Sequence, residues 1–332
     1  MEWRLVLENF LSPPILFFFL GVLAVTLKSD LQIPQPFPKV LSLYLLFSIG
    51  LKGGAELAHS GIHREVVMGL LAAVLMAVLV PIYTFFILRR KLDASNAAAI
   101  AATYGSISAV TFLTASSYLQ KMNVRYGLAL ETGGYMVAAM ALMESPAIVV
   151  GVLLVRGFRK SQSEEEQSSS WSELLGDAFF NGPVFLLVGS LLIGTISGEK
   201  GHEAVAPLTD SLFKGVLTFF LLDMGLLAAR QLRDLRQAGA FLGIFALVIP
   251  VVNAIVGIFV ARMVGISNRG TALLFATLCS SASYIAVPAA VRIAIPDANP
   301  SFYLPMALGV TFPWNISFGI PLYYVIVSQI WR

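Results

Sequence analysis

Apolar runs long enough to cross a bilayer recur along the whole chain. A helix needs about 20 residues to span the hydrocarbon of a membrane. Ten runs of about this length follow one another, at approximately residues 11–27, 38–58, 65–88, 94–119, 128–155, 178–196, 206–229, 237–263, 268–293 and 302–331. Because only helices and closed barrels can span hydrocarbon, runs this long predict an all-α polytopic membrane protein with ten transmembrane helices.

Composition supports this class and excludes others. Hydrophobic residues make up 57% of the chain and charged residues 12%, whereas about a quarter of a soluble domain is charged. The net charge is +3 and the basic residues are scattered, so no tract favours nucleic-acid binding. With a single cysteine, the chain cannot form an intrachain disulfide.

One hydrophilic stretch divides the ten runs into five and five. Residues 156–173 read RGFRKSQSEEEQSSSWSE, which is too polar to bury a core. The division predicts a first five-helix repeat over 1–156, a linker over 157–176 and a second five-helix repeat over 177–332. Lysine and arginine are more frequent on the linker side of the predicted topology, so we expect a cytoplasmic linker and both termini outside.

The two halves resemble each other in matching order. Four pairs of segments align: Pro14 with Pro183, LLFSIGLKGGAEL (45–57) with FLLDMGLLAARQL (220–232), ATYGSIS (102–108) with ATLCSSA (276–282), and Pro146 with Pro321. The second pair places Gly50 on Gly225. An odd number of spans per repeat makes the second half enter from the opposite side, which predicts an inverted repeat, a construction typical of secondary transporters.

Hydroxyl side chains gather in the middle of the fourth and ninth runs. They are Ser106, Ser108 and Thr111 in the fourth, and Ser280, Ser281 and Ser283 in the ninth. A broken helix survives in a bilayer only where it lines a polar cavity or is packed by protein. Two facing breaks would aim helix N-termini and hydroxyls at one point and so bind an anion. The alternative is that these small residues serve helix packing.

Two acidic residues lie inside apolar runs, where an ionisable group is costly and usually functional. Glu144 precedes Pro146, and Asp223 precedes Gly225 by two residues. We expect them to bind a cation such as Na⁺ or to carry a proton. A structural pair between Lys52 and Asp223 is the alternative for the latter. Asn253 and Asn315 line the cavity or bond between helices.

Enzyme motifs are absent from the sequence. His59 and His63 lack the glutamate of a zinc motif, and no P-loop or nucleophile elbow is present. An intramembrane hydrolase would need a base beside a serine, for which Lys52 is the sole candidate within a span. The sequence therefore favours a protein that is not an enzyme and has no cofactor.

Four segments resemble the SbtA family of sodium-dependent bicarbonate transporters. They are LQIPQPFPKVLSLYLLFSIGLKGGAEL (31–57), YGSISAVTFLTA (104–115), GGYMVAAMALMESPAIVVG (133–151) and VRIAIPDANPSFY (291–303). The resemblance implies gate and core parts drawn from both repeats, with spans 4 and 9 broken and crossing. It implies Na⁺-coupled import of bicarbonate across the cell membrane for carbon concentration, a homotrimer, and a PII-like cytoplasmic regulator that senses adenine nucleotides.

The resemblance also assigns site residues. Together with the hydroxyl pattern, it implies a substrate site made of Gly105, Ser106, Ser108, Thr111, Ser280, Ser281 and Ser283. The candidates for binding Na⁺ are Glu144, Asp223, Ser108 and Ser283. The chain departs from the family pattern at Val110, Ala282 and Tyr284, where some members carry serine, serine and aspartate. The alternative function is a Na⁺- or H⁺-coupled carrier of another small anion, such as a carboxylate, and a channel is third.

Overall fold

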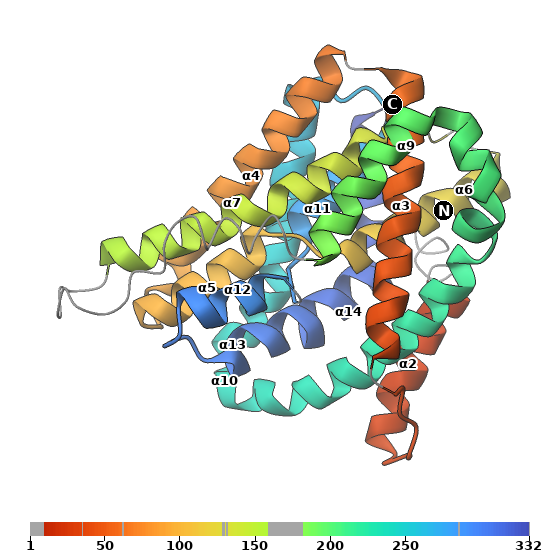
Figure 1. Cartoon of the computed structure of the whole chain (residues 1–332). Helices are drawn as coiled ribbons and strands as arrows, with labels where there is room; N and C mark the ends of the chain where they lie inside the picture. The colour runs from red at the N-terminus through yellow and green to blue at the C-terminus, as the bar shows by residue number, and fades with distance from the viewer. Residues whose placement is uncertain are drawn as a thin grey trace.

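The computed structural model describes residues 10–34, 36–61, 63–127, 130, 132–158, 182–284 and 286–331, and the chain is helical there, without a strand (Figure 1). The first half contains α2 (Pro13–Thr26), α3 (Phe37–Ser60), α4 (Arg64–Leu88), α5 (Ala94–Gly105), α6 (Ala109–Tyr126) and α7 (Tyr135–Phe158). The predicted linker 157–176 lies outside the described residues beyond Phe158.

The second half begins with α9 (Gly182–Ala206), the π-helical turn η1 (Pro207–Ser211) and α10 (Phe213–Met263). Gly239 interrupts α10 with a φ of 80°, a conformation that suits glycine, so α10 consists of two helical arms. There follow α11 (Arg269–Ser280), α12 (Ala286–Ala294), α13 (Pro300–Leu304), η2 (Pro305–Thr311), α14 (Phe312–Trp314), η3 (Asn315–Gly319) and α15 (Ile320–Ile330).

Six helical stretches are long and apolar enough to cross a membrane, and a seventh is added if the bent pair of Phe185–Ser211 and Phe213–Gln231 forms one span. The stretch from Ala94 to Val124 contains both α5 and α6, and the stretch from Pro300 to Ile330 contains the π-helical turns η2 and η3. The expected helical, multi-pass character is confirmed. The count of ten spans and the inverted repeat stay predictions.

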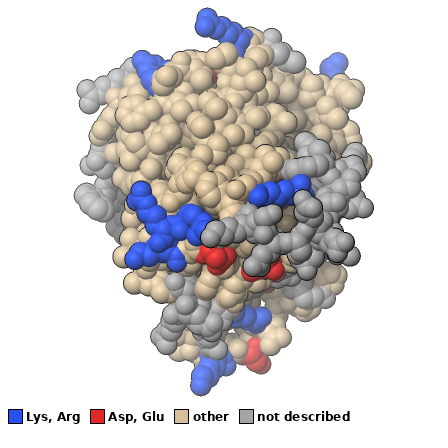
Figure 2. All heavy atoms as spheres, turned by 90° about the vertical axis from the view of Figure 1, so that its left-hand side faces the viewer, with Lys and Arg blue, Asp and Glu red and all other residues tan. Residues whose placement is uncertain are grey.

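The outer surface has the apolar character that lipid contact requires. On α4, Val67, Leu71, Leu75 and Leu79 recur every fourth residue and are all exposed, so they form one stripe along the helix. Figure 2 shows a broad area almost free of Lys, Arg, Asp and Glu between the charged side chains near its upper edge and those lower down. This area is suited to face the hydrocarbon of a bilayer.

Two helix pairs approach so closely that only glycine fits between them. α2 packs on the first arm of α10, where a Cβ on Gly225 would lie 2.0 Å from the Phe18 carbonyl oxygen. α3 packs on α9, where a Cβ on Gly54 would lie 2.1 Å from the Leu191 carbonyl oxygen; the two helices lie side by side in Figure 1. Small residues allow this approach, which stabilises helix pairs in membranes by backbone packing.

The two pairs use corresponding residues of the two halves. Gly50, aligned with Gly225 from the sequence, faces the Leu187 carbonyl oxygen and Ser190. Gly225 faces the Phe18 carbonyl oxygen and Gly21. Counting on from the aligned Pro14 and Pro183 matches Phe18 with Leu187 and Gly21 with Ser190. The same contact is therefore made twice, by aligned residues.

Candidate functional site

Two short helices, α5 and α11, lead into the site. Each has 12 residues and is almost completely buried. Each is capped in the same way: Asp93 Oδ1 accepts from the Asn96 backbone N–H at 2.9 Å, and Asn268 Oδ1 accepts from that of Thr271 at 2.8 Å. Partial burial favours a raised pKa for Asp93, but its hydrogen bonds with Asn96 hold the pKa below its ordinary value. The cap of α5 is therefore a carboxylate at neutral pH.

Both helices end at a serine in extended conformation. Ser106 follows α5 with φ −91° and ψ −172°, and Ser281 follows α11 with φ −80° and ψ 166°. Two residues further on, Ser108 Oγ accepts from the Thr111 backbone N–H, and Ser283 Oγ accepts from that of Val287, each at 3.2 Å. Structurally, Ser106 corresponds to Ser281, one residue away from the sequence alignment, which placed it on Ser280.

The two breaks are joined by hydrogen bonds. The Ser283 backbone N–H donates to the Thr103 carbonyl oxygen at 2.9 Å. The Ser108 backbone N–H donates to Ser281 Oγ, whose hydroxyl donates in turn to the Leu278 carbonyl oxygen, both at 2.9 Å. Segments far apart in the sequence thus meet at one point, as expected for the fourth and ninth runs.

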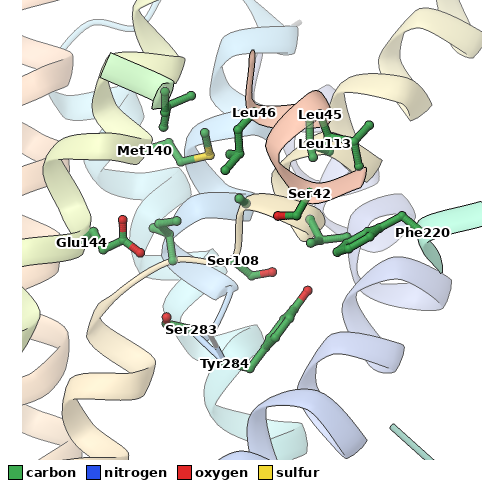
Figure 3. Close-up of a pocket in the computed structure, with 14 residues that line it drawn as sticks. Ser42, Leu45, Leu46, Ser108, Leu113, Met140, Glu144, Phe220, Ser283 and Tyr284 are labelled. Carbon is green, nitrogen blue, oxygen red and sulfur yellow. The ribbon is translucent and has the colours of Figure 1, made fainter. Parts of the chain in front are cut away.

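A cavity of about 60 Å³ lies beside these breaks. Its polar lining comes from Ser42 on α3, Ser108, Ser283, Tyr284 and the carboxylate of Glu144 on α7 (Figure 3). Its remaining wall is apolar and includes Leu45, Leu46, Val110, Leu113, Met140, Leu187 and Phe220. A water needs about 10–15 Å³ of such space, so the cavity has room for a small polyatomic ion.

The other predicted substrate residues are buried behind this lining. Ser280 donates its hydroxyl to the Thr277 carbonyl oxygen, and Thr111 donates its own to Ser108 Oγ. A Cβ on Gly105 would lie 2.1 Å from Pro81 Cγ, so close packing explains this glycine. Ser106 Oγ is buried without a hydrogen-bond partner among the described residues.

The two acidic candidates for the cation site lie in different places. Glu144 lies at the cavity with only 9% of its surface exposed. Asp223 is half-buried on α10 and does not line that cavity. The alternative of a Lys52–Asp223 pair is wrong for the described structure: Lys52 Nζ lies 3.5 Å from Asp210, which also lies 3.3 Å from His202 Nε2. The acidic partner of Lys52 comes instead from η1, the turn that contains Asp210.

The two intramembrane amides bond between helices. Asn253 Oδ1 accepts from the Tyr83 hydroxyl, which joins α10 to α4. Asn315 Nδ2 donates to the Ser280 carbonyl oxygen at 2.9 Å, which ties η3 to the end of α11. Neither residue lines the small cavity, so their contribution is to hold the helices around it.

Sequence reasoning missed Ser42, Phe220 and the cavity position of Tyr284. Ser42 could have been found as a hydroxyl in the second apolar run. The sequence singled out Tyr284 only as a departure from the family pattern. That it lines the same cavity as Glu144 depends on how α7 packs beside the break after α11, which no local pattern encodes.

A larger cavity of about 300 Å³ lies next along the same helices. Three helices contribute to both cavities from neighbouring turns: Leu46 then Ile49 from α3, Leu113 then Ser116 from α6, and Met140 then Val137 from α7. α10 contributes Phe220 to the first cavity and Phe213, two turns away, to the second. Its lining is more polar and includes Lys52, Glu56, Gln120, Asn123 and Asp210. We call this larger cavity the vestibule. It lies at the end of the molecule where α3 and α6 finish.

Within the described residues, no group of three or more His, Cys, Asp or Glu side chains could hold a metal ion. A hard cation such as Na⁺ needs oxygen ligands but not such a group. One carboxylate with hydroxyl and carbonyl oxygens is a suitable set for it. Glu144, Ser108 and Ser283 offer these ligand types around one cavity.

The apolar helices define an integral, multi-pass membrane protein, and a small cavity lies inside it beside two helix breaks. Residues 13–328 match the Na⁺-dependent bicarbonate transporter superfamily, and the chain belongs to this family. Its class is therefore that of a transporter rather than an enzyme. A comparison with curated proteins finds no match.

Proposed function

We propose that the chain imports bicarbonate together with Na⁺ by alternating access, and that the anion binds in the small cavity between the two broken spans. The observation that carries this proposal is the joint lining of the cavity by Ser108, Ser283 and Glu144. Donors for an anion and a ligand for a cation thus lie around one space. The family match supports the same pair of solutes.

The bonding of the two serines favours anion binding. Ser108 Oγ accepts from Thr111, and Ser283 Oγ accepts from the Val287 backbone, so each oxygen already serves a cap. Ser108 Oγ, which already accepts two hydrogen bonds, still offers its hydroxyl proton, and Ser283 Oγ offers its proton and one lone pair. Ala109 and Val110, at the start of the 18-residue helix α6, also line the cavity. The positive end of that helix adds to the attraction for an oxyanion.

The carboxylate of Glu144 supplies the coupling. A Na⁺ ion held by Glu144 beside the anion reduces the cost of burying both charges in a low dielectric. Each ion then raises the affinity for the other by the same factor, and this reciprocity links their transport. Asp223 remains a second candidate for a cation ligand, because a half-buried carboxylate on a membrane helix is costly without a partner.

A second candidate substrate is a short carboxylate. The cavity wall opposite the hydroxyls contains Leu45, Leu46, Leu113, Met140 and Phe220. An apolar wall offers bicarbonate no hydrogen bond in place of its lost hydration, but it is favourable toward a methyl or ethyl group, since burying each CH₂ contributes about 0.8 kcal/mol. Competition by acetate and propionate against labelled bicarbonate separates the two substrates.

The finer architecture belongs to the same proposal. Ten spans in a 5+5 inverted repeat are supported by the doubled glycine contact and by the equal lengths and matching caps of α5 and α11. Spans 4 and 9 cross at their breaks, as the hydrogen bonds between those breaks favour. Gate and core parts drawn from both repeats then move past each other.

The cellular setting is proposed from the resemblance and, for the orientation of the termini and linker, from the distribution of lysine and arginine. It comprises a homotrimer in the cell membrane, termini outside, a cytoplasmic linker, and regulation by a PII-like protein that senses adenine nucleotides. A role in carbon concentration follows from bicarbonate import.

Uptake of labelled bicarbonate tests the function. Cells or proteoliposomes that contain the chain should show saturable uptake at fixed pH that requires Na⁺ and is lost when choline replaces Na⁺. The physical reason is that a bound Na⁺ lowers the cost of burying the negative charge of the anion. Uptake that follows pH and ignores Na⁺ would contradict the coupling, and no uptake above empty vesicles would contradict the function.

Thiol labelling tests the route to the cavity. Ser116→Cys places a nearly isosteric thiol in the vestibule, and the sole native cysteine, Cys279, is buried. A membrane-impermeant thiol reagent should label Ser116→Cys from outside in intact cells, and bicarbonate with Na⁺ should slow the labelling.

Two controls fix the sidedness of that experiment. The parent chain should stay unlabelled because of the burial of Cys279. Lys91→Cys, at the exposed end of the α4–α5 connection, should react only after permeabilisation. Labelling of the two variants in the opposite pattern would reverse the proposed topology.

A further inference from the structure

Tyr284 lies in the non-helical segment between α11 and α12, next to Ser283. Only 8% of its surface is exposed. Its ring packs edge-on against Phe312 with centroids 5.5 Å apart. Phe312 itself is almost fully buried and also packs edge-on against Phe18, so the tyrosine ring is anchored by a rigid aromatic cluster.

The phenol oxygen is the unusual part of this residue. It is buried and makes no hydrogen bond of ordinary length among the described residues, although the Ser108 side chain lies beside it. A buried polar atom without a partner is costly and needs an explanation, such as a ligand. Figure 3 shows the hydroxyl pointing into the cavity from the side opposite Glu144, with Ser108 between them.

We propose that the Tyr284 hydroxyl is a further substrate-binding group, which donates a hydrogen bond to one oxygen of the bound anion. This rests on the proposed function of the cavity. With Ser108 and Ser283, it gives three hydroxyl donors around one space, enough to serve each oxygen of a small planar monovalent oxyanion. Because a phenol is neutral, it adds a donor to the site without a second negative charge to repel the anion.

The placement also explains why the residue is a tyrosine rather than a phenylalanine. Packing against Phe312 would be served equally well by phenylalanine, which would leave no buried hydroxyl unsatisfied. Without substrate the hydroxyl depends on water in the cavity for an acceptor, whereas a bound oxyanion provides a charged acceptor directly. A binding role and a structural role therefore predict different effects when the hydroxyl is removed.

The test compares Tyr284→Phe with Tyr104→Phe in purified protein. Tyr104 is also a buried tyrosine packed edge-on against a phenylalanine, Phe245, but its hydroxyl bonds to Thr311 Oγ1 at 2.7 Å. Thermal unfolding is measured without bicarbonate and during its titration at constant Na⁺. Labelled bicarbonate uptake in proteoliposomes is measured in parallel.

The two variants should behave in opposite ways. Tyr284→Phe should unfold at the same temperature as the parent protein or a higher one without bicarbonate, yet bind bicarbonate about tenfold or more weakly. Tyr104→Phe should unfold at a lower temperature with bicarbonate affinity unchanged. Tyr284→His, which keeps an N–H donor, should bind more tightly than Tyr284→Phe.

Each other outcome has a defined meaning. If the parent protein itself shows no response to bicarbonate, the proposed function fails before the variants are considered. If the parent protein responds and Tyr284→Phe has the same affinity, the inference about Tyr284 is wrong while the function stands. Equal losses of affinity in the phenylalanine and histidine variants, or failure of both to fold, would assign Tyr284 a structural role and also overturn the inference.

Discussion

Replacing Gly225 with valine should leave little folded protein in the membrane. The new Cβ would lie 2.0 Å from the Phe18 carbonyl oxygen and 3.2 Å from Gly21 Cα, both backbone atoms that cannot turn aside. α2 and α10 would have to separate, which forfeits their packing along the whole contact. Overpacking a core costs about 1–3 kcal/mol when side chains can adjust, and a clash with backbone exceeds that range. The measurement is the monodisperse yield and unfolding temperature after detergent extraction.

A matched glycine controls this substitution. Gly215 lies on the same helix, and a Cβ there would meet nothing within 4 Å, so Gly215→Val should be tolerated. The same reasoning applies to the contact between α3 and α9, where Gly54→Val should fail and Gly189→Val should not. Normal yield for Gly225→Val would mean that the α2–α10 contact is not required for folding.

Replacing Glu144 with glutamine should raise the Na⁺ concentration needed for half-maximal uptake by at least tenfold. The amide keeps the shape of the side chain but removes the charge that would hold the cation. Two unit charges about 4 Å apart attract by about 4 kcal/mol at an effective dielectric constant near 20. Even a third of that energy is about a tenfold change in affinity. Uptake measured against Na⁺ at several bicarbonate concentrations should show a smaller loss when both ions saturate.

The specificity of this effect is checked with other acids. Glu203→Gln removes a carboxylate from the exposed end of α9 and should leave the Na⁺ dependence unchanged. Asp223→Asn tests the other candidate ligand directly. A larger effect at Asp223 than at Glu144 would mean that the main Na⁺ site lies on α10. An unchanged Na⁺ requirement in Glu144→Gln would mean that Glu144 does not bind Na⁺.

The sequence predicted features that local patterns encode. Hydroxyl clusters in two apolar runs indicated the breaks after α5 and α11, and Ser108 and Ser283 do line a common cavity. Asp93 and Asn268, the residues just before α5 and α11, are ordinary helix caps of the kind that a local pattern encodes. The alignment of the breaks was one residue off, because serines follow one another in the ninth run and composition alone does not choose which one ends the helix.

Features that depend on long-range packing could not be predicted. The salt bridge of Lys52 with Asp210 joins residues 158 positions apart, and nothing near either residue indicates the other. The cavity position of Tyr284 depends on Phe312, which lies in the last span. The close approach of backbones at Gly225 also depends on which helix packs there, although the sequence alignment had already singled out Gly50 and Gly225.

The equal lengths of α5 and α11 have an electrical consequence. Twelve residues of helix rise about 18 Å, so in the proposed inverted arrangement the two breaks lie equally deep from opposite surfaces. A charge that reaches this depth crosses about half of the membrane potential, or about 1.2 kcal/mol per 100 mV. One bicarbonate and one Na⁺ bound together carry no net charge, so their combined binding from either side is almost independent of voltage. A second Na⁺ per anion would make binding from outside stronger as the cell interior becomes more negative.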